Sequence, residues 1–519
     1  MDCIKLDFRE TGLFSKLIVD YVEGNSKLDS FYAHPPTLKG YKKALEAKDF
    51  STDYRTTLVE VLNEQYANIE TPEAVIANIE SLSKEKTFTV TTGHQLNIFT
   101  GPLFYIYKLV ATINLAKKLS ETYPDYKFVP VYWMGSEDHD YEEINHLYID
   151  NKKYEWETDQ GGATGRFNTD GLDEVLNQLP GRTEVFKQAL KKHTNLSDVV
   201  RDYVNALFGS EGLVCLDADD ARFKKEFLYV IKEELFEEIS HPLVETQSNA
   251  LDEAGYKQQL QPRELNLFYL VDGLRARIVK EGDRFSVVDT DLQFSTQEIE
   301  ALVESNPERF SPNVILRPLY QEVILPNLGY VGGPSELAYW FQLKSVFDHF
   351  KLAFPILMPR SFVMYLGQVT CRKIDKLGVA FKNLFLREDL FINAYVKSKS
   401  NGQLSLDKAK EAVALLYAGI KEKAVKVDTT LAAMVESEQI NSVKSINRVE
   451  HKMLKAEKRH RADELRMLHE IYASIYPGGV PHERRENILS VDDPNFIEQL
   501  FAQLNPLDLK YVILKSDNS

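Results

Sequence analysis

Cysteine is scarce in this sequence: Cys3, Cys215 and Cys371 are the only three among 519 residues. They are odd in number, far apart and form no C-x-x-C pair, which argues against a disulfide framework and a thiolate metal site. No apolar run approaches the ~18 residues that a membrane-spanning helix needs. Residues 1–7 lack the basic segment and apolar core of a signal peptide. We therefore expect a cytoplasmic protein with no membrane partner.

Positive charge is also in deficit. The chain has 62 basic and 78 acidic residues, a formal net charge of −16. Nucleic-acid binding depends on clustered Lys and Arg, so we expect no nucleic-acid partner. Phosphate-binding glycine motifs are missing too, because no G-x-G-x-x-G follows a strand and the glycine-rich loop 159–166 lacks the Lys-Ser/Thr ending of a P-loop. We interpret this loop as a flexible part of an insertion rather than as a phosphate cradle.

Two polar loops carry most of the candidate site residues. Residues 87–90 and 128–134 have the apolar pattern of strands, and residues 102–119 have that of a buried helix. This order is typical of a βαβ unit in a parallel sheet. The loops after the two strands, 91–101 and 135–146, then lie at the carboxyl edge of the sheet, where ligands bind in such folds.

The second loop is rich in ionisable groups, which lie at Glu137, Asp138, His139, Asp140, Glu142, Glu143 and His146. They are suited to binding a substrate ammonium or hydroxyl group, or to supplying a general base whose pKa is adjusted by like charges. Asp138, His139 and His146 are also possible ligands of a divalent metal, but no H-E-x-x-H spacing supports this and we predict no metal site. The plain alternative is a solvated loop that caps the next helix.

Groups suited to anions occur at three points. His94 follows Gly93 beside the helix that starts at Pro102, whose free backbone N–H groups favour a phosphate or carboxylate. Gly333-Pro334 repeats the Gly101-Pro102 helix start after another apolar run. Arg360 ends the strand-like run 354–360. Lys108 is ambiguous, since a lysine at a domain contact explains it equally well.

The C-terminal third predicts a long helical arm. Apolar residues at heptad spacing run from about 405 to 437, and a second run covers 446 to 475, ending at 477–479. We interpret these as an antiparallel hairpin of two helices, a kind of arm that often dimerises. The expected organisation is a helical segment (1–86), the first half of the core (87–146), an insertion (147–210), a core strand with helices (211–261), a small β insertion (262–312), the second half of the core (313–397), the arm (398–476) and a segment returning to the core (477–519).

Several of these motifs, in this order, resemble one known family. They are residues 93–95 (GHQ), 99–103 (FTGPL), 137–140 (EDHD), 143–146 (EINH), 317–321 (RPLYQ), 325–327 (LPN) and 330–334 (YVGGP). Together with the arm, they resemble the cysteine-adding enzymes of bacillithiol biosynthesis (BshC) over essentially the whole chain. The resemblance implies an α/β fold: a Rossmann-like parallel-sheet core with inserted connecting domains and a C-terminal coiled-coil arm that makes a homodimer.

The resemblance also implies a ligase that joins L-cysteine to the amino group of glucosaminyl malate. Amide formation needs an activated carboxyl group, and a nucleotide such as ATP is the implied activator; adenylate and acyl-phosphate routes stay open. The candidate catalytic residues are His94, Glu137, Asp138 and His139. The candidate substrate-binding residues are Gln95, Thr100, Gly101, Asp140, Asn145, Tyr320, Gln321, Asn327, Tyr330, Gly332, Gly333 and Arg360. The alternatives are a dimeric binding or scaffold protein without catalysis and a metal-dependent hydrolase.

Overall fold

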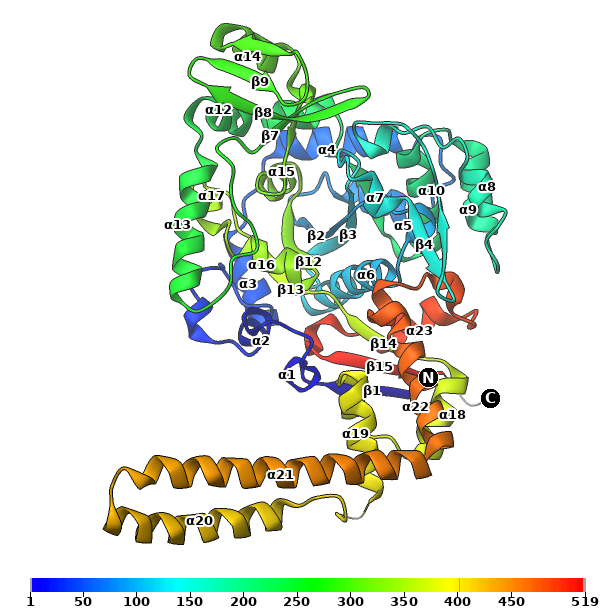
Figure 1. The fold of residues 1–519 in the computed structure, drawn as a ribbon. Helices are drawn as coiled ribbons and strands as arrows, with labels where there is room; N and C mark the ends of the chain where they lie inside the picture. Colours follow the sequence, from blue (N-terminus) through cyan, green and yellow to red (C-terminus); the bar gives the residue numbers. More distant parts are fainter. Residues whose placement is uncertain (1, 401, 517–519) are drawn as a thin grey trace. The chain divides into compact units, whose positions relative to one another are not determined.

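The computed structural model describes residues 2–400 and 402–516, which form two compact units (Figure 1). Within the described chain, the larger unit consists of residues 2–9, 13–365 and 480–514. The smaller unit consists of residues 10–12, 366–400, 402–479 and 515–516. None of the described helices is both long and apolar enough to cross a bilayer.

A five-stranded parallel sheet forms the Rossmann-like core of the larger unit, in the order β13-β12-β2-β3-β6. Helix α6 (Phe104–Thr122) connects β2 to β3 and packs on both, which confirms the predicted βαβ unit. The helix begins two residues after the predicted start at Pro102. The strands are β2 (Thr87–His94), β3 (Lys127–Met134), β6 (Val214–Asp217), β12 (Asn327–Gly332) and β13 (Ile356–Pro359).

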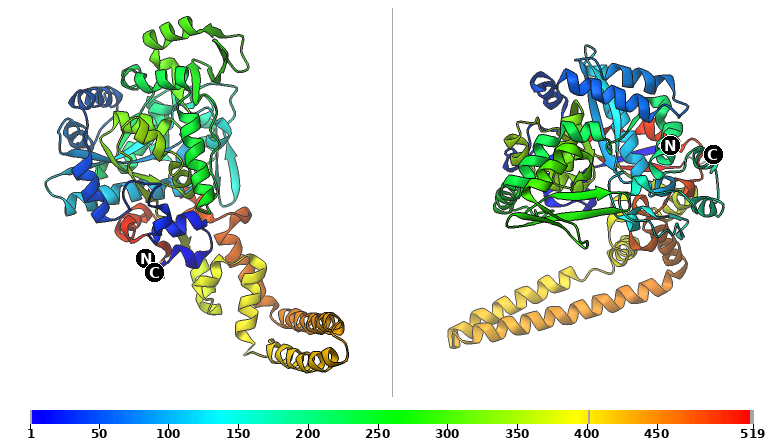
Figure 2. Two further views of the ribbon diagram at one scale, coloured as in Figure 1. Left: turned by 90° about the vertical axis from the view of Figure 1, so that its left-hand side faces the viewer. Right: turned by 90° about the horizontal axis from the view of Figure 1, so that it is seen from above.

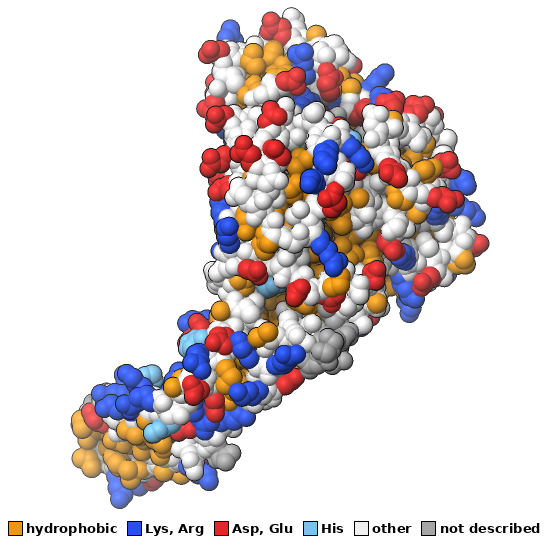
Figure 3. All heavy atoms as spheres, turned by 90° about the vertical axis from the view of Figure 1, so that its right-hand side faces the viewer, with side chains coloured by type: hydrophobic (Ala, Val, Ile, Leu, Met, Phe, Trp, Pro, Cys, Tyr) orange, Lys and Arg blue, Asp and Glu red, His pale blue; other side chains and the backbone are white. Residues whose placement is uncertain are grey.

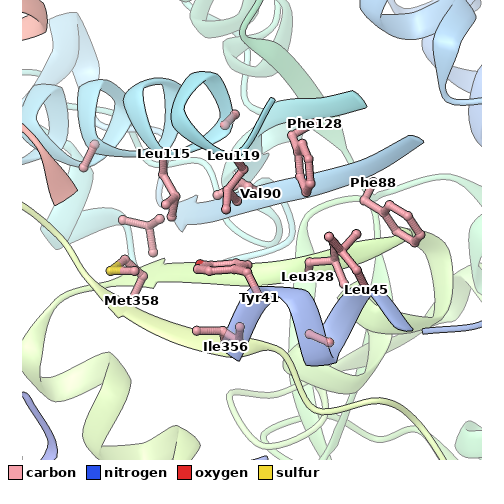
Figure 4. Close-up of a cluster of buried hydrophobic side chains, with 14 residues drawn as sticks. Tyr41, Leu45, Phe88, Val90, Leu115, Leu119, Phe128, Leu328, Ile356 and Met358 are labelled. Atoms are coloured by element: carbon pink, nitrogen blue, oxygen red, sulfur yellow. The ribbon is translucent and has the colours of Figure 1, made fainter. Parts of the chain in front are cut away.

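Apolar side chains from distant parts of the chain meet on this sheet (Figure 4). Val90 of β2 packs with Leu115 and Leu119 of α6, and Tyr41 of helix α3 (Leu38–Ala47) joins the same cluster. Burying such side chains contributes roughly 1.5–3 kcal/mol each. The cluster therefore anchors the strands whose carboxyl ends carry the polar loops.

The first 86 residues are mostly helical, as predicted, but they begin with a strand. Strand β1 (Asp2–Leu6) joins a separate three-stranded sheet with β15 (Tyr511–Lys515) and β14 (Phe362–Leu366). Its short sequence, DCIKL, does not stand out from the sequence alone, since its partners lie at the other end of the chain. The helices that follow are α1 (Phe8–Thr11), α2 (Lys16–Val22), α3, α4 (Thr52–Gln65) and α5 (Glu73–Ser81).

The predicted insertion after the second polar loop is tied to that loop. The amides of Thr164 and Gly165 donate to the carbonyl oxygens of Asp138 (2.7 Å) and Ser136 (2.8 Å). Residues 163–165 are buried, so the prediction of a flexible loop is wrong for its second half. Helix α7 (Tyr141–Ile144) lies within the second polar loop, and β4 (His146–Ile149) begins at the last residue of that loop. The insertion continues with β5 (Lys152–Glu155), α8 (Leu172–Leu176), α9 (Glu184–Lys192) and α10 (Leu196–Phe208).

An antiparallel five-stranded sheet lies in the segment 262–312, where we expected a small β insertion. It has the order β10-β9-β8-β7-β11, and its strands are β7 (Leu267–Val271), β8 (Leu274–Glu281), β9 (Arg284–Val287), β10 (Gln293–Ser295) and β11 (Phe310–Pro312). The other helices of the larger unit are α11 (Ala221–Glu226), α12 (Leu228–Glu237), α13 (Ser240–Glu253), α14 (Thr296–Ser305), α15 (Arg317–Ile324), α16 (Pro334–Trp340), α17 (Lys344–His349) and α23 (Phe496–Gln503).

The smaller unit contains the coiled-coil hairpin (Figure 2). Tyr417 contacts Ser442 (2.9 Å) and Lys410 contacts Glu450, an antiparallel register. The turn lies at 428–430 rather than after 437, because Asp428 accepts hydrogen bonds from Thr430 and starts the second helix there. The helices of the smaller unit are α18 (Gln368–Leu377), α19 (Glu388–Lys399), α20 (Asp407–Val427), α21 (Leu431–His460) and α22 (Ala462–Ile475).

Candidate active site

A cavity of about 840 Å³ opens at the carboxyl edge of the parallel sheet, within the larger unit. His94 ends β2, Gly135 follows β3, Gly333 follows β12 and Arg360 follows β13, and all four line the cavity. This is the edge at which open α/β sheets bind ligands. The expected convergence of the two polar loops is therefore realised.

His94 is a half-buried, neutral histidine. Its ring lies 5.3 Å from that of Phe104 and 5.0 Å from that of Tyr105, measured between centroids. Burial and the charge of Lys108 lower the pKa of His94 to about 3, so the imidazole carries no charge at neutral pH. Its Nε2 atom is buried without a hydrogen-bond partner in the described chain. His94 can therefore form a hydrogen bond with a ligand, but not as an imidazolium.

Lys108 and Glu336 form an ion pair that links α6 to α16. Lys108 Nζ lies 3.0 and 2.8 Å from the two carboxylate oxygens and 2.6 Å from the carbonyl oxygen of Gly93. Glu336 also accepts hydrogen bonds from the Tyr330 hydroxyl and the Gly333 amide, each at 2.7 Å. Burial opposes ionisation of Glu336, yet Lys108 and these donors hold its pKa below the usual value. The hydrogen-bonding positions of the pair are filled by protein groups, so the pair holds α6 and α16 together.

Arg317 differs, since its half-buried side chain forms no ion pair with any carboxylate that the structure describes. Its Nη1 donates to Gln321 Oε1 at 3.1 Å, whereas Nη2 is buried and has no partner in the described chain. The guanidinium carbon lies 5.5 Å from the ring centre of Tyr330 and 5.9 Å from that of Trp133. Buried charges are normally paired. Arg317 is therefore the best placed group to hold an anionic part of a ligand.

Glu137 of the second polar loop is engaged with a buried lysine. Lys224 Nζ lies 2.7 Å from Glu137 Oε2 and also donates to the Phe310 carbonyl oxygen at 3.2 Å. Burial raises the pKa of Glu137 and the attraction of Lys224 opposes this rise. The pair fixes the start of the loop against helix α11.

Asp138 and His139 are the more accessible members of this loop. Asp138 Oδ2 accepts a hydrogen bond from Gln95 Nε2 at 2.8 Å, which joins the two polar loops. Asp138 Oδ1 accepts from the backbone amides of His139 (2.8 Å) and Asp140 (3.3 Å). Arg275 of the β insertion contacts His139 Nδ1 at 2.7 Å. The loop conformation is thus fixed by groups from three segments.

Arg360, expected to bind an anion, already has a carboxylate partner. Its Nη2 and Nη1 atoms lie 2.7 and 3.1 Å from the two oxygens of Glu483, and both side chains are buried. Glu483 Oε2 also accepts from the Val363 amide at 3.1 Å. Arg360 therefore fastens residue 483 to the end of β13, and its charge is largely neutralised.

The helix N-termini are less open than expected. The amide of Leu103, just before α6, donates to the carbonyl oxygen of Glu486 at 2.8 Å. At the second Gly-Pro start, the Gly333 amide is taken by Glu336. The prediction of free N–H groups at both helix starts is wrong for these two amides, because the carbonyl oxygen of a distant residue accepts from the first and the carboxylate of Glu336, three residues on, accepts from the second.

The cavity brings together part of the predicted site. The predicted residues that line it are His94, Gln95, Glu137, Asp138, His139, Tyr320, Tyr330, Gly333 and Arg360. The predicted residues that do not are Thr100, Gly101, Asp140, Asn145, Gln321, Asn327 and Gly332.

Three of these residues are structural parts of the second half of the core. Asn327 is buried, accepts hydrogen bonds from Thr89 and Thr91 and donates to Glu322. Gln321 is fully buried and also donates to Glu322, at 3.1 Å. A Cβ on Gly332 would lie 2.9 Å from the Tyr330 ring, so this glycine allows close packing. These three residues therefore contribute hydrogen bonds or close packing to the fold and do not line the cavity.

The other four lie around the first half of the core. Thr100 (φ 73°) and Gly101 (φ 52°) form a left-handed turn, and Asn487 Nδ2 donates to the carbonyl oxygens of Phe99 (2.8 Å) and Gly101 (2.6 Å). Asn145 is buried beside His146 Nδ1 at 2.8 Å. Asp140 is exposed beyond the cavity.

The possible metal ligands Asp138, His139 and His146 do not come together in the described residues. No group of three or more His, Cys, Asp or Glu side chains there is arranged to hold an ion. His146 lies on β4 and does not line the cavity that contains Asp138 and His139. The sequence neighbours therefore do not converge into one ligand set.

Several cavity residues were not predicted from sequence. Arg317 is the first residue of the 317–321 motif, and this position is the sequence feature that could have pointed to a role in the site. Glu336 is the third residue after Gly333, the spacing of a helix-capping acid. Arg275 had no signal, since it lies on an insertion strand. Lys108 was left ambiguous.

Comparison with known proteins identifies the family. Residues 1–361 match the family model "Bacillithiol biosynthesis BshC, N-terminal Rossmann-like domain", and residues 363–516 match "Bacillithiol biosynthesis BshC, C-terminal coiled-coil domain". Relatives named "Putative cysteine ligase BshC" include one from Flavobacterium johnsoniae (39% identical, 99% of each chain covered). Those from Cytophaga hutchinsonii (39%, 97% of each) and Chlorobaculum tepidum (30%, 94% of each) have the same name.

Proposed function

Because the chain belongs to the BshC family of bacillithiol biosynthesis, we propose that it is a ligase that joins the carboxyl group of L-cysteine to the amine of glucosaminyl malate. The product is bacillithiol and the new bond is an amide. The observation that carries this proposal is the guanidinium of Arg317, which lines the cavity and has a buried Nη2 atom without a hydrogen-bond partner in the described chain.

The charge of the cavity fits the sugar substrate. Seven basic and four acidic side chains line it, in a chain whose net charge is −16. Malate contributes two carboxylates that stay ionised throughout the reaction, and a guanidinium binds a carboxylate through two parallel hydrogen bonds. We assign one malate carboxylate to Arg317, with neutral His94 beside it. The acidic loop at Asp138 would bind the amine or hydroxyls of the sugar.

Activation of the cysteine carboxyl group requires a further reagent, and we propose a nucleotide such as ATP. Arg263, Arg277 and Arg484 line the cavity and have no carboxylate partner in the described chain, so their guanidinium groups suit phosphate oxygens. Bound there, the nucleotide would supply the phosphoryl or adenylyl group that turns the carboxylate into an acylating agent.

We also propose a cytoplasmic homodimer formed through the helical arm. Large apolar side chains are exposed on α20 and α21, and such side chains gather at one end of the arm with Lys and Arg (Figure 3). Examples are Leu415 (76% exposed), Leu416 (61%), Val427 (83%) and Met434 (62%). Exposed apolar patches commonly mark protein contacts.

The test combines a product assay with calorimetry. Purified protein incubated with cysteine, glucosaminyl malate, ATP and magnesium should form bacillithiol by mass spectrometry, and AMP or ADP would identify the route of activation. Substituting Arg317→Ala removes hydrogen bonds to a charged group, worth about 1.5–3 kcal/mol, so the Kd for glucosaminyl malate should rise about 10- to 150-fold. The Kd of Arg317→Lys should lie between those of wild type and Arg317→Ala, because lysine keeps the positive charge but lacks the two parallel N–H groups of the guanidinium.

Arg222→Ala is the matched control. Arg222 is an arginine paired with Glu64 and Asp220 outside this cavity, and its loss should leave the Kd unchanged. Equal Kd values for wild type and Arg317→Ala would refute the assignment of Arg317. Tight binding of the sugar substrate without any consumption of cysteine would favour a non-catalytic binding protein.

A further inference from the structure

We infer that Arg275, from the β insertion, holds His139 as a neutral imidazole whose Nε2–H donates a hydrogen bond to an oxygen atom of the substrate. Arg275 is then a positioning residue, and His139 is a donor rather than the base that takes a proton from the attacking amine. This inference rests on the proposed function for the identity of the substrate, but the state of the ring is independent of it.

The contact between the two side chains determines the tautomer. Arg275 Nη1 lies 2.7 Å from His139 Nδ1. A guanidinium has only N–H donors and no acceptor, so Nδ1 must offer its lone pair. The single ring proton of neutral His139 then sits on Nε2. Since Nδ1 is occupied and His139 lines the cavity, Nε2–H is the group left for a ligand.

Arg275 is itself held rigidly by the insertion. Its Nε donates to Ser311 Oγ at 3.1 Å and its Nη2 to the Pro312 carbonyl oxygen at 3.1 Å. Its guanidinium carbon lies 4.1 Å from the centre of the Phe268 ring, and its side chain is 7% exposed. Strands β7, β8 and β11 thus place one donor on the second polar loop, a pre-organised arrangement that a surface arginine lacks.

The charges around His139 are mixed. Burial and Arg275 lower the pKa of His139, whereas Asp138 and Asp140 oppose this lowering. Asp138 Oδ1 is 3.7 Å from His139 Nδ1, too far for a hydrogen bond, and it is already engaged with two backbone amides. A proton added at Nδ1 would point at the guanidinium 2.7 Å away. The geometry therefore disfavours the imidazolium.

A donor role has a chemical use at this position. When an amine adds to an activated carboxyl group, negative charge develops on the carbonyl oxygen, and a fixed N–H group stabilises it. The same N–H also suits a sugar hydroxyl or malate carboxylate oxygen. In each case the histidine keeps its proton. The attacking amine forms the C–N bond and loses its proton to solvent, and phosphate or AMP leaves with the electron pair of the broken acyl C–O bond.

The direct test is the tautomer in the full-length protein without substrate. We would label histidine with ¹⁵N and record two- and three-bond ¹H–¹⁵N correlations between pH 6 and 8. The expected result for His139 is an unprotonated Nδ1 and a protonated Nε2. His469 is the internal control with the opposite pattern, since its Nδ1 lies 2.7 Å from Glu388, which can only accept. A protonated His139 Nδ1 would overturn the inference.

Variants test the role. His139→Gln keeps an N–H near the Nε2 position, so it should retain more product formation than His139→Ala, which should lose about 10²- to 10³-fold in kcat, the usual loss of one such donor. Arg275→Met should let His139 exchange tautomers and titrate, giving the pH profile a new inflection between pH 6 and 7. Arg275→Lys, which restores a donor, should suppress that inflection.

The outcomes separate two failures. Equal losses for His139→Gln and His139→Ala in folded protein, or a pH profile unaffected by Arg275→Met, would refute the donor role. If wild type forms no product but has the expected tautomer, the ligase proposal fails and the positioning of His139 by Arg275 stands.

Discussion

The pair formed by Arg360 and Glu483 allows a quantitative prediction of stability. Glu483→Gln keeps the volume of the side chain and one oxygen acceptor but removes the negative charge. Arg360, 2% exposed, would then be a buried cation without a counter-ion. Breaking a buried pair in this way typically costs 3–5 kcal/mol.

This cost predicts a shift in melting temperature. Unfolding entropy is about 2.1 cal/mol/K per residue, so the larger unit, of about 400 residues, has an unfolding entropy of about 0.8 kcal/mol/K. Dividing 3–5 kcal/mol by this value gives a decrease in Tm of about 4–6 °C. The double variant Arg360→Met/Glu483→Gln should recover most of this loss, because no unpaired charge remains buried.

Differential scanning calorimetry of the full chain measures these shifts. Glu121→Gln is the control, since Glu121 pairs with Lys118 on the surface at 3.0 Å and exposed pairs contribute at most about 1 kcal/mol. Its Tm should fall by about 1 °C or less. A Glu483→Gln variant that melts within 1 °C of wild type, or a double variant less stable than Glu483→Gln, would refute the reasoning.

Two more predictions concern the cavity. The pKa of His94 is about 3 in the folded chain and about 6.5 in the unfolded chain, so only the unfolded chain gains this proton as the pH falls below 6.5. By pH 5 this protonation lowers the free energy of unfolding by about 2 kcal/mol. The variant His94→Gln should therefore show a correspondingly weaker decrease in stability between pH 7 and 5 in urea titrations. Gly165→Ala would put a Cβ 2.5 Å from Ser136 and Ser197, so it should lower kcat in the product assay and cost about 1–3 kcal/mol in urea unfolding, whereas Gly419→Ala, with nothing within 4 Å, should do neither.

The core could be predicted from sequence because its signals are local. Apolar runs at 87–90 and 128–134, a helix between them and a Gly-Pro start identify a βαβ unit without knowledge of the rest. The same holds for the small β insertion, which has turns at Gly273 and Gly282. Strand β1 lacked such a signal, since only pairing with β15 at the far end of the chain makes it a strand.

The site was most predictable near the carboxyl ends of the parallel strands. His94 ends β2, Asp138 lies in the loop after β3, and both line the cavity. Asn327 and Thr100 belong to equally distinctive motifs, but their hydrogen bonds are used inside the fold. A motif shows that polar groups matter without showing which way they point. Arg275 lies on an insertion strand, and its contact with His139 depends on tertiary packing.

The anchoring of residues 483–487 has a consequence for biosynthesis. Arg360 and its partner Glu483 are 123 residues apart, and Asn487 holds a turn 386 residues earlier in the chain. As the ribosome makes the protein, the parallel sheet has all its strands once residue 359 has emerged, while the Arg360 charge and the 99–101 turn still wait for their partners. A nascent chain, or one released early by a stop codon within the arm, would thus contain the sheet without a finished pocket. Synthesis through residue 487 is therefore needed before these contacts of the site can form.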